Sequence, residues 1–176
     1  MKNSFCLCFL IRPTGEGRHE RRRERTENLP EPADLKPVLT PDEVNELLAR
    51  VYPELNAQLG SYDAVDIFAG GCTVRLNADE RHLRPGGTVS GPSLFTLADI
   101  GGYVCVLSHA GPDVLSVTTN LNINFLRKPA QADLIADARL MKVGKRLAVG
   151  EVVLTSAGSD DPVAHVTATY SIPNNR

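Results

Sequence analysis

Aromatic residues and excess charge are both scarce in this chain. It has no tryptophan, only 5% aromatic residues and a net charge of −2 over 176 residues. A protein that binds nucleic acid through its surface usually shows basic clusters and stacking aromatics. The composition therefore favours a soluble globular protein whose main partner is not nucleic acid, and the length suggests one domain with its own core.

Cysteine is also scarce, and its spacing argues against two common structural roles. Cys6, Cys8, Cys72 and Cys105 show neither the paired spacing of a zinc site nor a disulfide framework. Cys6 and Cys8 could bind a metal only with further ligands that the sequence does not supply nearby. We therefore expect no bound metal and a reducing compartment, the cytoplasm.

Long apolar runs are absent as well. A helix needs about 20 apolar residues to cross a bilayer, whereas the longest internal candidate, 94–107, is shorter and contains Asp99. Near the N-terminus, the apolar run 5–11 ends at Arg12 and is followed by charged residues rather than by a cleavage site. We therefore expect neither a membrane span nor a secretory signal.

The segment 12–34 mixes Arg, Glu and Pro without apolar periodicity. Such a segment cannot bury enough surface to offset the entropy lost on ordering. We predict a disordered tail over residues 1–35, followed by a single domain over 36–176. The arginines at 21–23 could contact RNA or anionic lipid, but the interleaved glutamates favour a solvated tail.

The rest of the sequence shows two helix patterns and six strand patterns. The segment Thr40-Pro-Asp-Glu is a capping pattern for an amphipathic helix that ends near Pro53. A second helix has Pro92 at its first position and Gly111 beyond its end. Strands are expected at 62–69, 73–77, 114–126, 132–143, 146–156 and 162–172. The order predicts an α+β fold with one antiparallel sheet, in which the last four strands pair consecutively as a meander.

The second helix is apolar around its whole circumference, so we expect it to be buried nearly all round. A sheet wrapped around this long central helix, the hotdog arrangement, would bury it best. Asp99 interrupts the apolar surface, and a buried carboxylate is costly unless it is paired or faces a cleft. Gly101 and Gly102 follow it and indicate close approach of backbone or ligand. These residues alone support a structural and a catalytic role for Asp99 equally.

The start of the same helix is a second candidate for chemistry. Free N–H groups and the positive end of the helix dipole gather around Gly91, where they suit an oxyanion. The sequence Ser90-Gly91-Pro92 is also that of an ordinary capped helix start, and the residues alone favour this simpler interpretation.

Three segments resemble the PaaI-type hotdog thioesterases. They are R-P-G-G-T-V-S-G-P-S-L-F-T-L-A-D at 84–99, N-L-N-I-N-F-L-R-K-P at 120–129 and A-R-L-M-K-V-G-K-R-L-A-V-G-E-V at 138–152. The likeness runs from about Leu39 to Ile172. It implies a hotdog fold and an enzyme that hydrolyses acyl-CoA thioesters to free acid and CoA. It also implies that no metal or cofactor is needed, since coenzyme A is part of the substrate.

The resemblance also implies roles for individual residues. Asp99 would be the nucleophile or general base, and the backbone N–H of Gly91 would polarise the thioester carbonyl. Ser90 stands at the position of the family's usual His. Pro92 replaces a second Gly and so removes one backbone donor. Thr118 lies where some relatives place a Ser or Thr near the water or the carboxylate.

The spacing of two of these residues predicts the assembly. Gly91 and Asp99 are eight residues apart, which is about 12 Å along a helix. One carbonyl cannot contact both groups. If both act on the same thioester, they come from different chains, which makes a homodimer the smallest active unit. We expect such dimers to form a homotetramer.

The phosphates of CoA would require cations near the mouth of the site. Arg84, which replaces an Asn common in the family, is one candidate. The others are basic residues near predicted strand ends: Arg127, Lys128, Lys142, Lys145 and Arg146. Basic residues in such places are more often simply solvated, so both interpretations stay open.

Two other functions stay open on the sequence alone. A hydratase or dehydratase acting on acyl thioesters would pair a His with an acid. However, His82 and His109 fall in expected loops, His165 on a strand and His19 in the tail. A non-catalytic acyl-CoA-binding protein is the second alternative, because the loop around Ser90 departs from the family pattern.

Overall fold

The computed structural model describes residues 34–59, 61–112 and 115–173. Most of the expected tail, including Cys6 and Cys8, therefore lies outside the described residues. The helices are α2 (Pro41–Val51), α3 (Glu54–Leu59), the short 3-10 helix η2 (Glu80–His82) and α4 (Gly91–Ala110). The strands are β1 (Ser61–Phe68), β2 (Gly71–Asn77), β3 (Leu83–Arg84), β4 (Thr88–Val89), β5 (Val117–Phe125), β6 (Leu134–Val143), β7 (Leu147–Ser156) and β8 (Pro162–Ser171).

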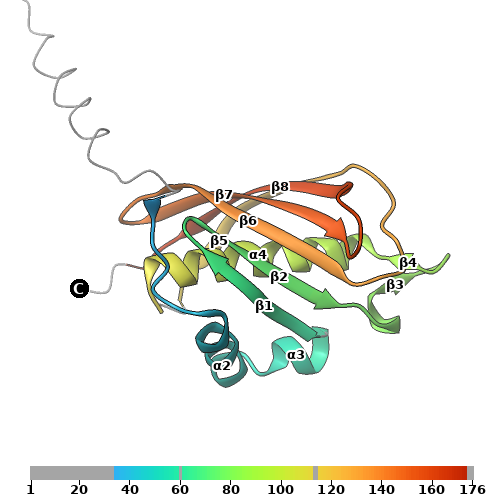
Figure 1. The fold of residues 1–176 in the computed structure, drawn as a ribbon, viewed down its shortest axis with the longest axis horizontal. Coiled ribbons are helices and arrows are strands. Elements are labelled where there is room, and N and C mark those ends of the chain that lie inside the picture. The colour runs from blue at the N-terminus through green and yellow to red at the C-terminus, as the bar shows by residue number, and fades with distance from the viewer. Residues whose placement is uncertain (1–33, 60, 113–114, 174–176) are drawn as a thin grey trace, which may run out of the picture. The chain divides into compact units, whose positions relative to one another are not determined.

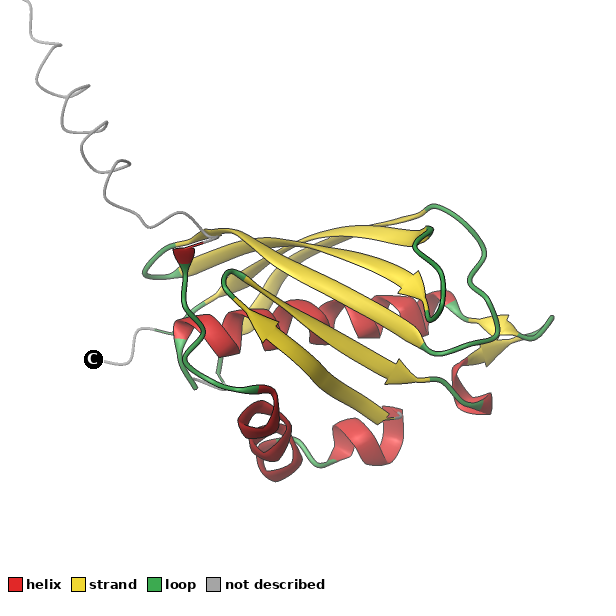
Figure 2. Cartoon of the chain, viewed as in Figure 1, coloured by secondary structure: helices red, strands yellow, loops and turns green. Residues whose placement is uncertain are grey.

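The six long strands form one antiparallel sheet in the order β1-β2-β6-β7-β8-β5 (Figure 2). The meander is confirmed for β6, β7 and β8 but is wrong for β5, which does not pair with β6. Instead β5 pairs with β8 at the sheet edge, with Val117 opposite Ser171 and Phe125 opposite Ala164. Strands that follow each other in the sequence often pair, but they do not always do so. Here the chain leaving α4 returns along one flank of the helix, so the sheet can curve around it.

Helix α4 lies along the concave face of the sheet and contacts all six long strands (Figure 1). The expected hotdog arrangement is therefore confirmed. Leu97, Val104 and Leu107 of α4 are fully buried against inward-facing strand residues such as Val152 and Leu154. By length and composition α4 would suffice to cross a membrane, but 72% of its apolar window is buried inside the protein. Its hydrophobicity is that of a core helix.

The sheet does not cover one face of α4, so the expectation that this helix is buried nearly all round is wrong for that face. Pro92, Phe95, Asp99 and Tyr103 recur at helical spacing and are exposed or half-buried. A curved sheet covers a helix from one side and both flanks, which leaves one face for other elements to cover. Asp99 lies on this less covered stripe, so its carboxylate is not sealed in the core.

The helix starts follow the capping patterns in the sequence. Thr40 caps α2, and its side chain and that of Glu43 form the expected capping box. Helix α4 begins at Gly91 with Ser90 as its cap, so Pro92 occupies the second helical position rather than the first. The turn of α3 and the small β3–β4 hairpin had not been expected. Helices α2 and α3 pack beside β1, and α2 also contacts α4.

Candidate active site

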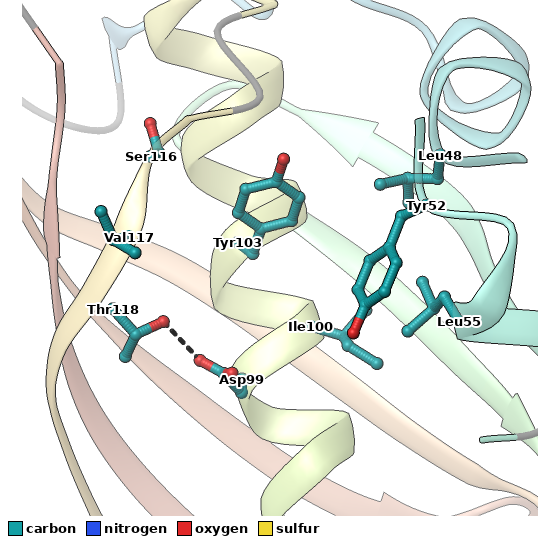
Figure 3. Close-up of a pocket in the computed structure, with 9 residues that line it drawn as sticks. All are labelled: Leu48, Tyr52, Leu55, Asp99, Ile100, Tyr103, Ser116, Val117 and Thr118. Atoms are coloured by element: carbon teal, nitrogen blue, oxygen red, sulfur yellow. Dashed lines mark hydrogen bonds between the residues drawn. The ribbon is translucent and has the colours of Figure 1, made fainter. Parts of the chain in front are cut away.

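The Asp99 carboxylate is held on one side only. The Thr118 hydroxyl donates a hydrogen bond of 2.6 Å to Asp99 Oδ1 (Figure 3). The Tyr170 hydroxyl donates to the backbone carbonyl of Asp99 at 2.9 Å and lies 3.4 Å from Oδ1. No hydrogen bond to Oδ2 comes from any residue that the structure describes. One carboxylate oxygen is therefore fixed, and the other is available for chemistry.

Thr118 points at Asp99 because β5 contains a β-bulge. Thr118 lies opposite Tyr170 on β8, so the two side chains share the helix-facing side of the sheet. The register then shifts between Thr118 and Asn120, and the half-buried Leu121 packs against the core. Residues three apart on a regular strand face opposite sides. The bulge thus lets both Thr118 and Leu121 face the helix, as bulges near functional sites commonly do.

A pocket of about 250 Å³ opens beside Asp99 (Figure 3). Its lining is mostly apolar and comes from α2, α3, α4, β5 and their ends: Leu48, Tyr52, Leu55, Asp99, Ile100, Tyr103, Ser116, Val117 and Thr118. The α2–α3 side of this pocket could not be foreseen, because an amphipathic helix pattern does not show what the helix packs against. The site therefore joins an ionisable group to an apolar chamber.

The start of α4 offers a single backbone donor. The Ser90 hydroxyl accepts a hydrogen bond of 3.3 Å from the Ser93 N–H and lies 2.9 Å from the Ser93 hydroxyl. Ser90 is therefore a helix cap in this structure. The Gly91 N–H has no partner in the described part of the chain. The Phe125 ring packs nearby, since a Cβ at Gly91 would lie 3.6 Å from its Cζ.

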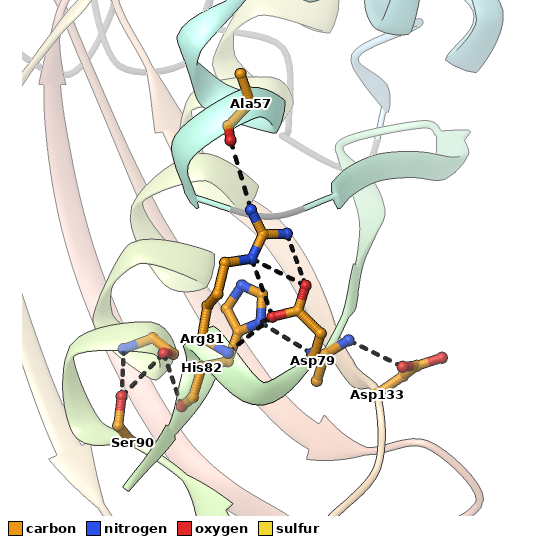
Figure 4. A network of polar contacts seen from close by, with 8 residues as sticks. Ala57, Asp79, Arg81, His82, Ser90 and Asp133 are labelled. Atoms are coloured by element: carbon orange, nitrogen blue, oxygen red, sulfur yellow. Dashed lines mark hydrogen bonds and ion pairs between the residues drawn. The ribbon is translucent and has the colours of Figure 1, made fainter.

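A polar network holds the loop that precedes α4 (Figure 4). The Arg81 guanidinium pairs with Asp79 at 2.6 Å and donates to the Ala57 carbonyl at 3.4 Å. The hydrogen bonds from Arg81 lower the pKa of Asp79 to about 2. His82 is buried and accepts from the Asp79 N–H through Nδ1 at 3.0 Å.

The carbonyl of His82 connects this loop to the helix. It accepts hydrogen bonds from the Ser90 N–H at 2.8 Å and from the Ser93 hydroxyl at 3.1 Å. The network around Asp79 therefore fixes the position of the first turn of α4, and with it the position of the Gly91 N–H.

The basic residues considered for CoA lie at two ends of the domain. Arg84, Arg127 and Lys128 are exposed and flank the end where α4 begins, and Arg127 pairs with Asp161 at 2.6 Å. The other group is exposed at the β6–β7 turn, near the end where α4 terminates (Figure 1): Lys142, Lys145 and Arg146. Within one chain these groups are separated by the 20 residues of α4, about 30 Å.

No histidine in the described ranges lines the Asp99 pocket. His109 is in α4, not in a loop as expected, and its Nδ1 lies 2.8 Å from the Cys105 carbonyl. His165 pairs with Glu151 at 3.2 Å on the sheet. Among the residues that the structure describes, no three His, Cys, Asp or Glu side chains are arranged to hold a metal ion.

Tyr170 is the part of the site that the sequence did not predict. It lies 71 residues from Asp99, and the packing of β8 on α4 brings it there. The single hint was Gly102, one of the two helix glycines that indicated close approach. A Cβ at Gly102 would lie 2.3 Å from the Tyr170 hydroxyl oxygen. The close approach is therefore that of a tyrosine side chain.

Comparisons with known proteins agree with this geometry. The family model described as the thioesterase superfamily matches residues 86–163, which include Gly91, Asp99 and Thr118. A candidate esterase of Pseudomonas aeruginosa is 34% identical over 102 residues, which are 57% of this chain and 74% of that protein. The crystal structure of a candidate thioesterase from Silicibacter sp. TM1040 is 46% identical, with a TM-score of 0.73. The match covers 80% of this chain and 96% of that one.

The phenylacetic acid degradation protein PaaI from Thermus thermophilus, solved as a mutant, shares the fold at 23% identity. Its TM-score is 0.58, and the match covers 69% of this chain and 99% of that chain. The central helix, the wrapped sheet and the sequence likeness all lead to one assignment: the chain belongs to the thioesterase superfamily and has the hotdog fold that it shares with PaaI.

Proposed function

We propose that the protein hydrolyses acyl-CoA thioesters to a free acid and CoA, with Asp99 as the catalytic carboxylate. One observation carries the proposal. Asp99 lines a mostly apolar pocket with one oxygen held by Thr118 and the other without a partner among the described residues. Such a site suits an apolar acyl group that ends in a polar, reactive carbonyl. Membership of the thioesterase superfamily supports thioester hydrolysis as the reaction.

The available oxygen, Asp99 Oδ2, has two ways to act. As a general base it takes a proton from water, and the water oxygen bonds to the thioester carbon. The C–S bond then breaks, and the departing CoA sulfur takes up the proton from Asp99. As a nucleophile, Oδ2 bonds to the thioester carbon and the C–S bond breaks, which gives a mixed anhydride and the CoA thiolate. Water then hydrolyses the anhydride to the free acid and the Asp99 carboxylate, and a proton from that water neutralises the thiolate. Neither route requires a metal or a cofactor.

The pocket beside Asp99 is proposed to hold the acyl group. Leu48, Leu55 and Ile100 supply apolar walls, and the Tyr52 ring lies over Ile100 (Figure 3). The volume of about 250 Å³ is slightly below the range of about 300–1,000 Å³ that is typical of sites for drug-sized ligands. This volume suits a short or medium-length acyl group.

The proposed catalytic unit is a homodimer. The Gly91 N–H is the proposed donor to the thioester oxygen, and it lies too far along α4 to serve the Asp99 of its own chain. Strand β5 is at an open sheet edge, next to the site through Thr118. Exposed apolar side chains lie along and beside this strand: Leu115, Val117, Phe125 and Leu126. Pairing with a second copy would cover these side chains and satisfy the edge. The homotetramer stays a prediction.

The cations for CoA are proposed at the end of the domain where α4 begins. Arg84 and Lys128 are exposed there. Neither is part of an ion pair within the described residues. Arg127 is less suited because its guanidinium is paired with Asp161.

The rival functions differ in what they require of the same site. A hydratase needs a proton-transferring group such as His near the acid, and no described histidine lines the pocket. A non-catalytic binder needs only the pocket. The altered loop, in which Pro92 removes one donor and Ser90 caps the helix, is the feature that would suit such a binder.

A thiol-release assay over short, medium, long and aromatic acyl-CoAs tests the proposal. We expect release of free CoA with at least one short or medium acyl group. Hydration of an enoyl-CoA without thiol release would contradict the proposal in favour of the hydratase. Saturable binding of acyl-CoA by calorimetry, without turnover of any substrate, would contradict it in favour of the binder.

A further inference from the structure

The hydroxyl of Tyr170 is buried where α4 crosses β5 and β8, directly behind the Asp99 carboxylate. Tyr170 is 1% exposed and is among the largest fully buried side chains of the domain. Its hydroxyl contacts two groups of Asp99: the backbone carbonyl at 2.9 Å and Oδ1 at 3.4 Å. A core tyrosine that only filled space would not need to contact both the main chain and the side chain of this residue.

We propose that Tyr170 is a positioning residue that orients Asp99 for catalysis. In this proposal Gly102, which has no side chain, leaves the space on α4 that the Tyr170 hydroxyl occupies. The proposal rests on the function proposed for Asp99 above. It assigns a role to two residues that the sequence motifs leave without one.

Position 102 requires a glycine because the Tyr170 hydroxyl lies very close to the backbone of α4. A Cβ at position 102 would lie 2.3 Å from the Tyr170 hydroxyl oxygen, 2.9 Å from Cζ and 3.0 Å from Cε2. No side chain tolerates such contacts. Glycine inside a helix is destabilising relative to alanine, so its presence here needs a compensating reason. Gly101 is different, because a Cβ there would lie 3.2 Å from the Ala136 methyl, a tight contact that a shift of a few tenths of an ångström would relieve.

The hydrogen bonds distinguish the two oxygens of the carboxylate. The Tyr170 hydroxyl has one proton, and its best acceptor is the Asp99 carbonyl, so it ties the main chain of α4 at this residue to β8. The Thr118 proton goes to Oδ1, and Tyr170, opposite Thr118 on the neighbouring strand, has its hydroxyl 3.4 Å from Oδ1. Residues of β5 and β8 therefore hold Oδ1 in place, and Oδ2 becomes the reacting oxygen.

The hydroxyl stays protonated in the working range of pH. Burial raises the pKa of Tyr170 well above its ordinary value, and the nearby charge of Asp99 raises it further. Tyr170 is consequently a donor and not a second anion beside Asp99. A fixed donor behind the carboxylate costs no reorganisation during the reaction, which is how preorganised sites gain rate.

The test is a comparison of steady-state kinetics in the full-length protein with Tyr170→Phe, which keeps the ring and removes the hydroxyl. Loss of a hydrogen bond to a charged site typically corresponds to about a 10- to 100-fold effect. We expect kcat to fall by about that factor while KM changes less than about twofold. Ser108→Ala is the control, since it removes another buried hydroxyl of α4 that bonds only to groups away from Asp99. It should leave kcat unchanged.

Gly102→Ala supplies an independent arm if Tyr170→Phe folds poorly. The added methyl should push the hydroxyl away from Asp99 and lower kcat. In the double variant the methyl no longer meets the hydroxyl, although it still lies close to the ring, so the two effects should be non-additive and the combined loss in kcat should be smaller than the product of the two single losses. An unchanged kcat per folded molecule in Tyr170→Phe, or additive effects in the double variant, would overturn the positioning role. If Asp99→Asn were nevertheless inactive, the proposed function would stand while this inference fell.

Discussion

Gly91 and Asp99 lie on the same helix, eight residues and about 12 Å apart along its axis. A thioester oxygen within hydrogen-bonding distance of the Gly91 N–H therefore cannot belong to a carbonyl that the same chain's Asp99 attacks. If both groups serve one substrate, each active site combines the start of α4 from one chain with the middle of α4 from another.

The Gly91 N–H can be removed with little change to the backbone. Ser90 has φ −78° and ψ 156°, a conformation that a following proline tolerates, so Gly91→Pro should fold. We expect kcat to fall by about 10²- to 10³-fold, as for loss of one oxyanion donor. Gly91→Ala is the matched control, because it keeps the N–H and its Cβ would make ordinary contact with Phe125. Equal kcat values for the two variants would show that the N–H has no catalytic role.

Mixing two inactive variants tests whether the sites are shared. Subunits with Asp99→Ala and subunits with Gly91→Pro should regain part of the activity when they form heterodimers, since one of the two sites then has both groups intact. The measurement is thiol release before and after subunit exchange, with exchange itself followed by mass spectrometry of differently tagged chains. Verified exchange without recovery would contradict shared sites.

Some residues of the site could be predicted from the sequence and others could not. Asp99 was identifiable because a charge in an apolar helix is anomalous, and Gly91 and Thr118 because they fall in recognisable motifs. Tyr170 was not, since it lies 71 residues from Asp99 and reaches it only through the packing of β8 on α4. Leu48 and Tyr52 were likewise missed, because their contribution depends on where α2 packs.

The size of the acyl pocket should depend on Tyr52. This residue follows α2, is 46% exposed and lies over Ile100 in the pocket (Figure 3). Tyr52→Ala removes the ring and should shift the preferred acyl group towards longer chains, seen as lower KM for those substrates. Stability should change little, because the ring is half exposed. Val51→Ala is the control, since Val51 is similarly exposed and does not line the pocket. The pocket assignment fails if both variants show the same chain-length profile.

His109 should make stability depend on pH. Burial by itself lowers the pKa of His109, but hydrogen bonds to Cys105 and Phe68 raise it above its ordinary value. Its two nitrogens lie 2.8 Å and 3.0 Å from the carbonyls of Cys105 and Phe68, and only the imidazolium can donate to both. The Gly70 N–H, 3.1 Å from Nε2, has the Leu35 carbonyl as an alternative acceptor.

The direction of this pH dependence follows from linkage. The folded-state pKa lies above the unfolded value of about 6.5, so the stabilisation is fully present below that pH and is lost as pH rises through the folded-state pKa. Urea unfolding of the wild type and of His109→Gln from acidic to alkaline pH should show the difference between them shrinking as pH rises. A constant difference would mean that His109 is not charged in the folded protein.

The fold, like the site, could be predicted in part from the sequence. The capping box at Thr40 and the alternating strands placed the main elements within a few residues. The strand order was harder, because adjacency in sequence favours pairing of β5 with β6 and only the wrapping of the sheet around α4 puts β5 beside β8. The β3–β4 hairpin has two-residue strands, too short to produce a periodic pattern.

The central claim concerns Asp99, and the kcat of Asp99→Asn for the best acyl-CoA substrate tests it most directly. The amide has the same shape and can still accept the Thr118 hydrogen bond, so the variant should fold with unchanged circular dichroism. Asp160→Asn, at an exposed turn, is the control for loss of a carboxylate and should keep full activity. We predict a loss in kcat of about 10²- to 10⁴-fold for Asp99→Asn, the range for removal of a general base. Wild-type kcat in folded Asp99→Asn would contradict the account.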